Sequence, residues 1–115
     1  MKYMFLIFRS EAGLQAMANE SRTEMFAAYG AYTGALKQAG VMVSGDPLQM
    51  STTATTVRVA KGKTEVLNGP YAESKEQLGG YYVVDVPDLD AALSWAARCP
   101  GASIGAIEVR PLMSM

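Results

Sequence analysis

The sequence contains no histidine and only one cysteine, Cys99, in 115 residues. The absence of histidine removes the side chain that most often acts as a general base or a metal ligand near neutral pH. A single cysteine cannot form an intramolecular disulfide, and a zinc site of cysteines and histidines lacks its ligands. We therefore expect no metal site and no cofactor, and the lone thiol fits a cytoplasmic location.

An excess of charge of one sign is also missing, since ten basic side chains stand against eleven acidic ones and no basic cluster forms. Surfaces that bind nucleic acid need such a cluster, so we exclude nucleic acid as a partner. The apolar segment at residues 1–8 is too short to span a bilayer and lacks the features of a signal peptide, so we expect no membrane association. With half of its residues apolar, the chain suits one globular domain over residues 1–115.

Hydrophobic periodicity predicts the order β-α-β, a β-hairpin, and β-α-β again. The first helix is expected from Ser21, where Ser21 and Glu24 match a capping box, to a C-terminal glycine at Gly40. The second helix is expected from Asp88 to a stop at Pro100. Residues 11–19 fit either a short helix or a loop. The predicted strands are residues 3–8, 41–43, 52–60, 64–67, 81–86 and 104–110.

This order of elements predicts a ferredoxin-like α+β sandwich with the hairpin inserted at its middle. Two helices cover only one face of the sheet, yet residues 3–8 and 81–86 carry apolar side chains for both faces. The second face needs a cover that the chain does not supply. We therefore expect a two-fold homodimer that forms through the open face of the sheet.

Several segments resemble the YCII-related proteins, in the branch named for its DGPF motif. They are MKYMFLIF, ATTVRV, NGPYAESKEQLGGYYVVDVPDLDAALSWAARCPGA and IEVRPLM, in this order over nearly the whole chain. The name-giving motif reads Asn68-Gly69-Pro70-Tyr71, which keeps a turn-forming residue and an aromatic. The resemblance implies a dimeric α/β barrel of two ferredoxin-like protomers. It also implies two roles suggested for relatives, as small-molecule enzymes or in sigma-factor-type regulation.

The other branch of that family carries a His–Asp pair proposed as a catalytic dyad. Counting from Gly40 and from Pro100 places those two positions near Tyr29 and Cys99. A tyrosine with an ordinary pKa of about 10 is a poor base at neutral pH. We therefore do not expect the dyad chemistry in this chain.

The segment from Leu67 to Tyr81 combines glycines with charged side chains. Gly79 and Gly80 precede a strand, whereas glycines that bind phosphate precede a helix, so they indicate close backbone approach instead. The charges at Glu73, Lys75 and Glu76 have two open interpretations, which are the lining of a pocket or a solvated loop.

Two arginines next to apolar strands are further candidates. Arg9 ends the first strand and Arg58 lies in the hairpin, and a guanidinium directed into a barrel interior needs a carboxylate or an anionic ligand. Arg58 with Glu73 is one such pair, and Arg9 is either a ligand-binding residue or a solvated strand end. The tyrosine hydroxyls, including that of Tyr29, fit a pocket lining, although their spacing is more typical of a core.

These observations lead to three functional hypotheses. In the first, the homodimer binds a small polar or anionic molecule beside the sheet; the candidate binding residues are Arg9, Tyr29, Arg58, Glu73 and Lys75. In the second, the protein is a cofactor-independent isomerase or lyase that uses Glu73 as acid or base and Tyr29 as proton donor. In the third, it is a regulatory or protein-interaction module.

Overall fold

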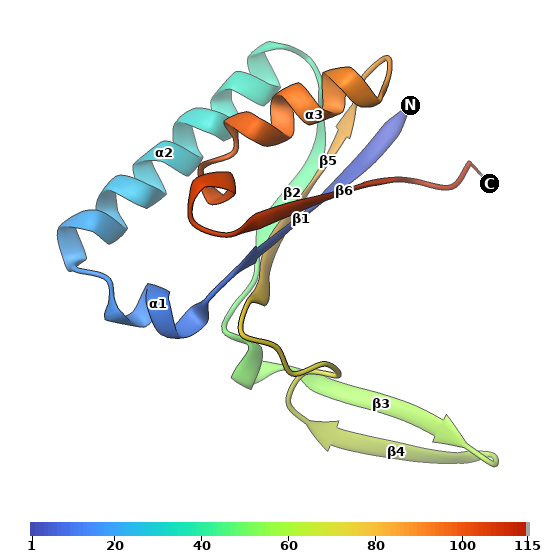
Figure 1. Ribbon diagram of the computed structural model, residues 1–115. Coiled ribbons are helices and arrows are strands. Elements are labelled where there is room, and N and C mark those ends of the chain that lie inside the picture. The colour runs from blue at the N-terminus through green and yellow to red at the C-terminus, as the bar shows by residue number, and fades with distance from the viewer. Residues whose placement is uncertain (115) are drawn as a thin grey trace.

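The computed structural model describes residues 1–114, which form a sheet with helices on one side and a separate projecting hairpin (Figure 1). The main sheet has four strands, which are β1 (Lys2–Arg9), β2 (Met42–Pro47), β5 (Gln77–Asp85) and β6 (Ala106–Pro111). The helices are α1 (Glu11–Ala16), α2 (Asn19–Gln38) and α3 (Leu89–Arg98), with short 3₁₀ turns at Ser51–Thr53 and Pro100–Ser103. The hairpin consists of β3 (Thr55–Ala60) and β4 (Lys63–Asn68). Within the described chain, no helix is long and apolar enough to cross a membrane.

The main sheet has the order β2-β5-β1-β6, and every neighbouring pair of its strands is antiparallel. This is the order of a ferredoxin-like sheet, with β1 and β5 at the centre, and it confirms the predicted α+β class. The predicted insertion of a hairpin between β2 and β5 is also confirmed. The site described below depends on this order, because it places the ends of β1, β2 and β5 side by side.

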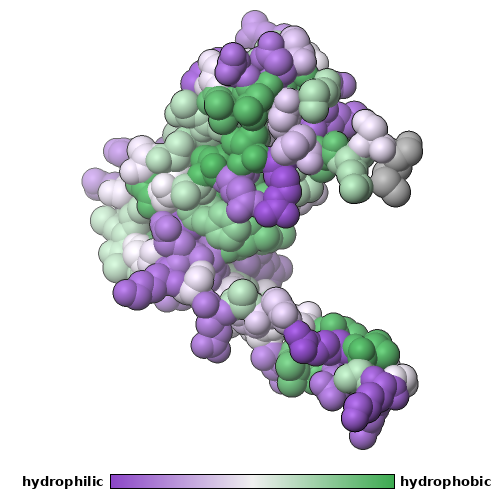
Figure 2. All heavy atoms as spheres, turned by 45° about the vertical axis from the view of Figure 1, so that its right-hand side comes forward, coloured by the Kyte–Doolittle hydropathy of each residue, from purple (hydrophilic) through white to green (hydrophobic). Residues whose placement is uncertain are grey.

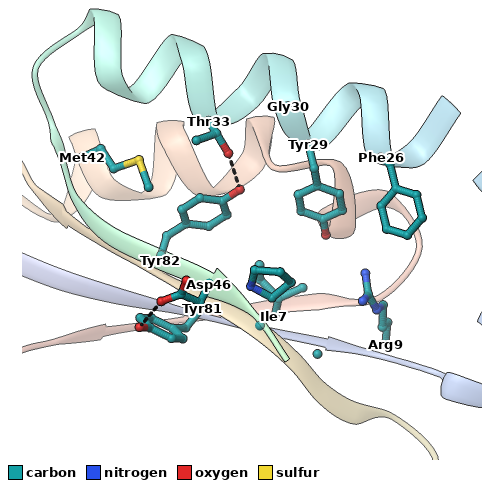
Figure 3. Close-up of a pocket in the computed structure, with 14 residues that line it drawn as sticks. Ile7, Arg9, Phe26, Tyr29, Gly30, Thr33, Met42, Asp46, Tyr81 and Tyr82 are labelled. Carbon is teal, nitrogen blue, oxygen red and sulfur yellow. Dashed lines mark hydrogen bonds between the residues drawn. The ribbon is translucent and has the colours of Figure 1, made fainter. Parts of the chain in front are cut away.

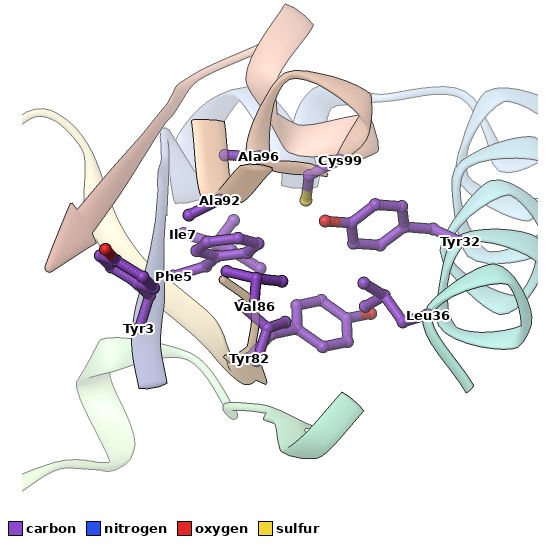
Figure 4. Close-up of a cluster of buried hydrophobic side chains, with 11 residues drawn as sticks. Tyr3, Phe5, Ile7, Tyr32, Leu36, Tyr82, Val86, Ala92, Ala96 and Cys99 are labelled. Atoms are coloured by element: carbon purple, nitrogen blue, oxygen red, sulfur yellow. The ribbon is translucent and has the colours of Figure 1, made fainter. Parts of the chain in front are cut away.

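The hydrophobic core fills the space between the sheet and the helices α2 and α3 (Figure 4). Alternate side chains of β1 point toward the helices, and Phe5 is fully buried there together with Leu36 of α2 and Val84 of β5. The hydroxyl group of Tyr32 donates a hydrogen bond to the Trp95 backbone oxygen at 2.8 Å, so this polar atom is satisfied inside the core. Two helices on one face thus bury half of the sheet, as the sequence predicts.

The first long helix begins earlier than the sequence predicts. Its N-cap is Ala18 without a side-chain hydrogen bond, so the predicted capping box of Ser21 and Glu24 is wrong. The physical reason is the neighbouring helix α1, which the sequence left open as a helix or a loop. Arg22 ties the two helices together by donating to three backbone oxygens, those of Leu14, Gln15 and Met17. The other helix-end predictions are confirmed, since Gly40 has a φ of +72° and Asp88 accepts from the backbone N–H of Ala91 at 2.9 Å.

Two strands of the main sheet, β2 and β5, extend four residues beyond one of their predicted ends. β2 continues through Gly45-Asp46-Pro47, where the sequence suggested a strand end, because Asp46 pairs with Tyr81 of β5. β5 starts at Gln77 rather than at Tyr81, so Gly79 and Gly80 lie inside the strand. A Cβ atom at Gly80 would lie 3.1 Å from the backbone oxygen of Asp46, which confirms the expected close backbone approach.

The two strands of the hairpin pair only with each other and not with the main sheet. Its two strands meet at a two-residue turn, Lys61-Gly62, in which both φ angles are positive at 52° and 75°. This geometry is that of the tight turns that favour hairpins. The first strand of the hairpin starts at Thr55, later than the predicted residue 52, because residues 51–53 form a 3₁₀ turn.

Glu11 anchors both chain segments that lead to the hairpin. Its carboxylate accepts hydrogen bonds from the backbone N–H of Ser51, at 2.6 Å, and from the Ser51 hydroxyl. Its own backbone N–H donates to the side-chain oxygen of Gln77 at 2.9 Å. One residue of α1 therefore holds the chain before β3 and the chain after β4 against the body of the domain.

The sheet face opposite the helices has no cover in one chain. Cross-strand pairs of Met4 with Val83 and of Leu6 with Tyr81 place these side chains on one face, and Phe8 follows on the same side of β1. Figure 2 shows apolar residues gathered over the body of the domain, between groups of polar residues. The structure confirms the two-sided sheet that the sequence predicts, and the pairing of two copies stays a prediction.

We expect Glu11→Ala to loosen the hairpin segment without unfolding the core. The substitution removes both hydrogen bonds to Ser51, each of which is charge-assisted. Amide hydrogen exchange measured by mass spectrometry should become faster over residues 51–76 and stay unchanged in β1 and α3. Glu20→Ala, which removes a carboxylate from the first turn of α2, is the matched control. Unchanged exchange over residues 51–76 would contradict the anchoring role.

Candidate functional site

A cavity of about 330 Å³ lies between α2 and the ends of β1, β2 and β5 (Figure 3). It lies beyond the end of the core, on the same side of the sheet. Its apolar lining comes mainly from Ile7, Phe26, Met42 and Pro47. Its polar side chains are those of Arg9, Tyr29, Thr33 and Tyr82; Asp46 and Tyr81 border it with their backbones, and their side chains lie on the other face of the sheet.

Arg9 brings a positive charge to the cavity. It continues the helix-facing side of β1 two residues after Ile7, and its side chain extends toward α2 (Figure 3). Space for it comes from Gly79, since a Cβ atom at that position would lie 2.9 Å from the Arg9 Nε atom. Gly79 is also the residue of β5 that the pairing with β1 skips, which identifies it as a bulge. Among residues 1–114, Arg9 forms no ion pair.

Tyr29 extends into the cavity from α2 and faces Arg9 (Figure 3). Its hydroxyl oxygen is buried, and it makes no hydrogen bond of normal geometry within the described part of the chain. The hydroxyl group packs against the 3₁₀ turn after α3, where a Cβ atom on Gly101 would lie only 2.5 Å from it. Burial raises the pKa of Tyr29 to about 12, with a further increase from Cys99 and an opposing effect of Arg9.

Cys99 lies close enough to Tyr29 for the two groups to influence each other's ionisation. The residue is buried at the C-terminal cap of α3, and burial raises the pKa of its thiol. These are the two positions where the resemblance places the His–Asp pair of the other branch. With both pKa values raised, the phenol and the thiol keep their protons at neutral pH. Neither group is then suited to act as a base.

The remaining polar side chains of the cavity satisfy one another. The hydroxyl groups of Thr33 and Tyr82 form a hydrogen bond at 2.8 Å. The Tyr81 hydroxyl donates to the Asp46 carboxylate at 2.9 Å, and this bond raises the pKa of Tyr81. The polar groups of the cavity that lack a strong partner in the described chain are therefore the guanidinium of Arg9 and the hydroxyl of Tyr29, which has only the Cys99 thiol beside it. Within residues 1–114, no cluster of three or more acidic, cysteine or histidine side chains is placed to hold a metal ion.

The five candidate residues from the sequence fall into separate regions. Arg9 and Tyr29 meet in the cavity, whereas Arg58, Glu73 and Lys75 lie outside it. Glu73 is exposed in the irregular segment 69–76, and Lys75 borders a shallow hollow together with Phe8 and Glu108. A single chain thus does not bring Glu73 to Tyr29.

Arg58 has a local partner that the sequence analysis did not name. Its guanidinium donates to the Tyr71 hydroxyl at 2.9 Å and lies 5.2 Å from the centre of the Tyr71 ring. The ion pair expected between Arg58 and Glu73 is not formed, so this prediction is wrong. Tyr71 directly follows the turn at Gly69-Pro70 and is two residues closer in sequence to the hairpin than Glu73 is. The ring of Tyr71 therefore lies next to Arg58, in the place expected for Glu73.

Phe26 and Thr33 line the cavity and Asp46 borders it, although none of the three was predicted from the sequence. Phe26, Tyr29 and Thr33 are spaced by three and four residues, which is the spacing of one helix face. This second stripe lies beside the core stripe that contains Tyr32 and Leu36. Its spacing could have predicted that Phe26 and Thr33 share a helix face with Tyr29. Asp46 carried no such signal, because only the pairing of β2 with β5 places it next to Tyr81.

Comparison with known proteins identifies the family of this chain. The YCII-related domain family matches residues 1–115. An uncharacterised protein of Rhizobium meliloti (strain 1021) is 36% identical over 114 residues, which cover 97% of this chain and 92% of that protein. Among solved structures, 5-chloro-2-hydroxyhydroquinone dehydrochlorinase (TftG) of Burkholderia phenoliruptrix AC1100, in complex with 2,5-dihydroxybenzoquinone, aligns with a TM-score of 0.57. That alignment covers 100% of this chain and 96% of the dehydrochlorinase at 19% identity, so the likeness concerns the fold. The chain belongs to the YCII-related domain family.

Proposed function

We propose that the cavity binds a small organic anion, with its apolar part between α2 and the sheet and its charged group at Arg9 and Tyr29. The observation that carries this proposal is the pairing of two donors that lack a strong acceptor. The Arg9 guanidinium has no acidic partner in the described chain, and the buried Tyr29 hydroxyl has beside it only the Cys99 thiol, a weak hydrogen-bond acceptor. Polar groups that lose contact with water need a partner, and a carboxylate or phenolate oxygen satisfies both donors at once.

The size and lining of the cavity support a small ligand with an apolar body. Its volume of about 330 Å³ lies at the lower end of the range of roughly 300–1,000 Å³ that is common for ligand pockets. The rings of Phe26 and Tyr82 and the side chain of Met42 offer flat or adaptable contact surfaces. A ring compound with one anionic oxygen group fits this combination.

The second candidate function is a cofactor-independent isomerase or lyase. It is favoured by the structural likeness to a dehydrochlorinase whose bound compound, 2,5-dihydroxybenzoquinone, is a small oxygenated ring. In this alternative Tyr29, protonated at neutral pH, donates a hydrogen bond to a substrate oxygen while Arg9 stabilises the negative charge that develops on that oxygen. An acid or base role for Glu73 would require this residue to come from another chain. We rank binding first, because the one carboxylate that borders the cavity in the described chain, that of Asp46, lies on the other face of the sheet and accepts from Tyr81 there.

We also propose the finer assignments that the sequence suggested. The chain is placed in the DGPF branch on the motif Asn68-Gly69-Pro70-Tyr71, in which Gly69 has a φ of +108° that favours glycine. Two copies pair through the open sheet face, in a cytoplasmic homodimer. A regulatory or interaction module linked to sigma-factor-type regulation remains the third alternative. The open cavity favours ligand binding over this alternative, which requires the cavity to be filled by the protein's own side chains.

We expect Arg9→Gln to abolish most of the ligand affinity while the fold stays intact. A charge-assisted hydrogen bond contributes about 1.5–3 kcal/mol, so the dissociation constant should rise roughly 10-fold to 100-fold. Thermal-shift screening with small aromatic carboxylates and phenols identifies a ligand, and titration calorimetry measures the change. Arg58→Gln is the matched control, because it removes the same group outside the cavity. An equal loss in both variants, or no response of the wild-type protein to any compound, would contradict the proposal.

We expect the stability of the protein to fall above pH 10 in a way that depends on Tyr29. Its pKa is raised from the ordinary value of 10.0 to about 12 in the folded state. Below pH 10 the folded and unfolded chains are both protonated, so Tyr29 does not affect the pH dependence. Between pH 10 and 12 the unfolded chain loses this proton more readily, which favours unfolding as the pH rises.

Urea denaturation at several pH values between 8 and 11.5 measures this effect. Tyr29→Phe removes the ionising group, so its free energy of unfolding should decrease less steeply above pH 10 than that of the wild type. Tyr71→Phe, which removes an exposed hydroxyl group, should keep the wild-type slope. Identical slopes in wild type and Tyr29→Phe would show that Tyr29 is not buried in its protonated form.

A further inference from the structure

The projecting hairpin exposes an apolar surface that one chain leaves without a partner. Val57 pairs with Val66 across the two strands, and Val59 lies two residues further on the same side of β3. These three side chains form the valine face, in which Val57 is 61%, Val59 67% and Val66 62% exposed. An isolated two-stranded hairpin is only marginally stable in water, and valines on its surface add no stability unless something covers them.

The opposite face of the hairpin is different in character. It carries Arg58 and Glu65, which lie directly across from each other in the strand register. The guanidinium of Arg58 is also covered in part by the ring of Tyr71. The hairpin therefore has one mixed face, which carries charged side chains and Leu67 and is partly covered by its own chain, and one bare face of valines.

The whole chain exposes far more surface than a compact monomer of its mass. Its accessible surface is 7819 Å², whereas about 6,100 Å² is expected for 12.3 kDa. Its radius of gyration is 16.0 Å, compared with about 13 Å for a compact domain of this length. The excess area of about 1,700 Å² is roughly twice the 800 Å² that one partner contributes to a standard protein interface. The shape of the chain thus suits a partner that covers a large surface.

The hairpin and the open sheet face lie on the same side of the molecule. In Figure 1 the hairpin leaves the domain on the side opposite the helices, and Figure 2 shows a hollow between the hairpin and the body. The open sheet face contributes the half-buried apolar side chains Met4, Leu6 and Phe8 on this side. A partner in the hollow would cover both surfaces together.

Charge indicates that this partner is a second copy of the chain. The hairpin, residues 55–68, has three basic side chains and one acidic one, and so a net charge of +2. The whole chain has a net charge of −1, which leaves −3 for the rest of the molecule. A basic arm and an acidic body in the same chain are complementary when two copies exchange arms. The lysines at the tip, Lys61 and Lys63, also disfavour open-ended addition of further strands.

We propose that the β3–β4 hairpin is a docking arm, whose valine face packs on a second copy of this chain. The two arms of a two-fold pair then enclose the dimer, and each arm extends the interface formed by the open sheet faces. This inference rests on the proposed homodimer, and it adds the hairpin as a separate, specific part of the interface. It is independent of the ligand proposed for the cavity.

Sedimentation velocity of the full chain tests the arm with two matched double variants. Val57→Lys with Val59→Lys places two charges on the valine face and should raise the dimer dissociation constant at least 100-fold, since each change acts twice in a two-fold dimer. Ala60→Lys with Leu67→Lys adds the same charges at exposed positions on the opposite face of the hairpin and should leave a dimer. Circular dichroism checks that all variants keep the fold. Equal weakening by both pairs would overturn the specific role of the valine face.

Two further results would overturn the proposal in distinguishable ways. A wild-type protein that stays monomeric at all concentrations overturns both the arm and the pairing of the sheets. A dimer that resists the valine substitutions but is broken by Leu6→Lys leaves the sheet pairing standing and overturns the arm. A photo-crosslinking residue at position 59 adds a direct readout, because docking predicts covalent dimers from this position and few from position 65. Ligand titration of the same variants reports separately on the cavity.

Discussion

The packing of β1 beneath the two helices is the interaction on which the rest of the structure depends. β1 is a central strand that pairs with β5 on one side and β6 on the other. Its alternating side chains place Phe5 in the core, in contact with the layer formed by α2 and α3. Burial of these apolar side chains is the main favourable contribution to the free energy of folding. It also fixes the height of α2 above the sheet, and therefore the space in which the cavity lies.

The cavity begins where the apolar pattern of each element stops. On β1 the helix-facing series ends at Ile7, and the next position on that face is Arg9. On α2 the core residue Tyr32 is followed, one turn toward the N-terminus, by Tyr29. On β5 the buried ring of Tyr82 is followed by Gly80, which adds no side chain. A cavity with polar side chains thus lies next to the core, because on three elements the apolar residues give way to polar residues or glycine at the same level.

The sheet leaves its other face uncovered for a similar reason. Two β-α-β units supply two helices, and both pack on one side because both crossovers have the same hand. The strands nevertheless carry apolar residues on the open side, such as Leu6 and Val83. Glu11 then ties the inserted hairpin to the body at the edge of that face. The packing of both helices on one side therefore leaves the other face open, and Glu11 holds the hairpin next to the same sheet.

The sequence by itself determined the strands, both long helices and the two-sided sheet, because these depend on periodic patterns and on local signals such as Asp88 and Gly40. It also identified Arg9 and Tyr29, since a charge at the end of an apolar strand and a phenol on a helix face are visible along the chain. Only the tertiary structure decided that these two residues meet, while Glu73 and Lys75 lie elsewhere. Neighbours in space come from strand pairing and helix packing over long sequence separations, and no local pattern encodes which of several charged residues those contacts bring together.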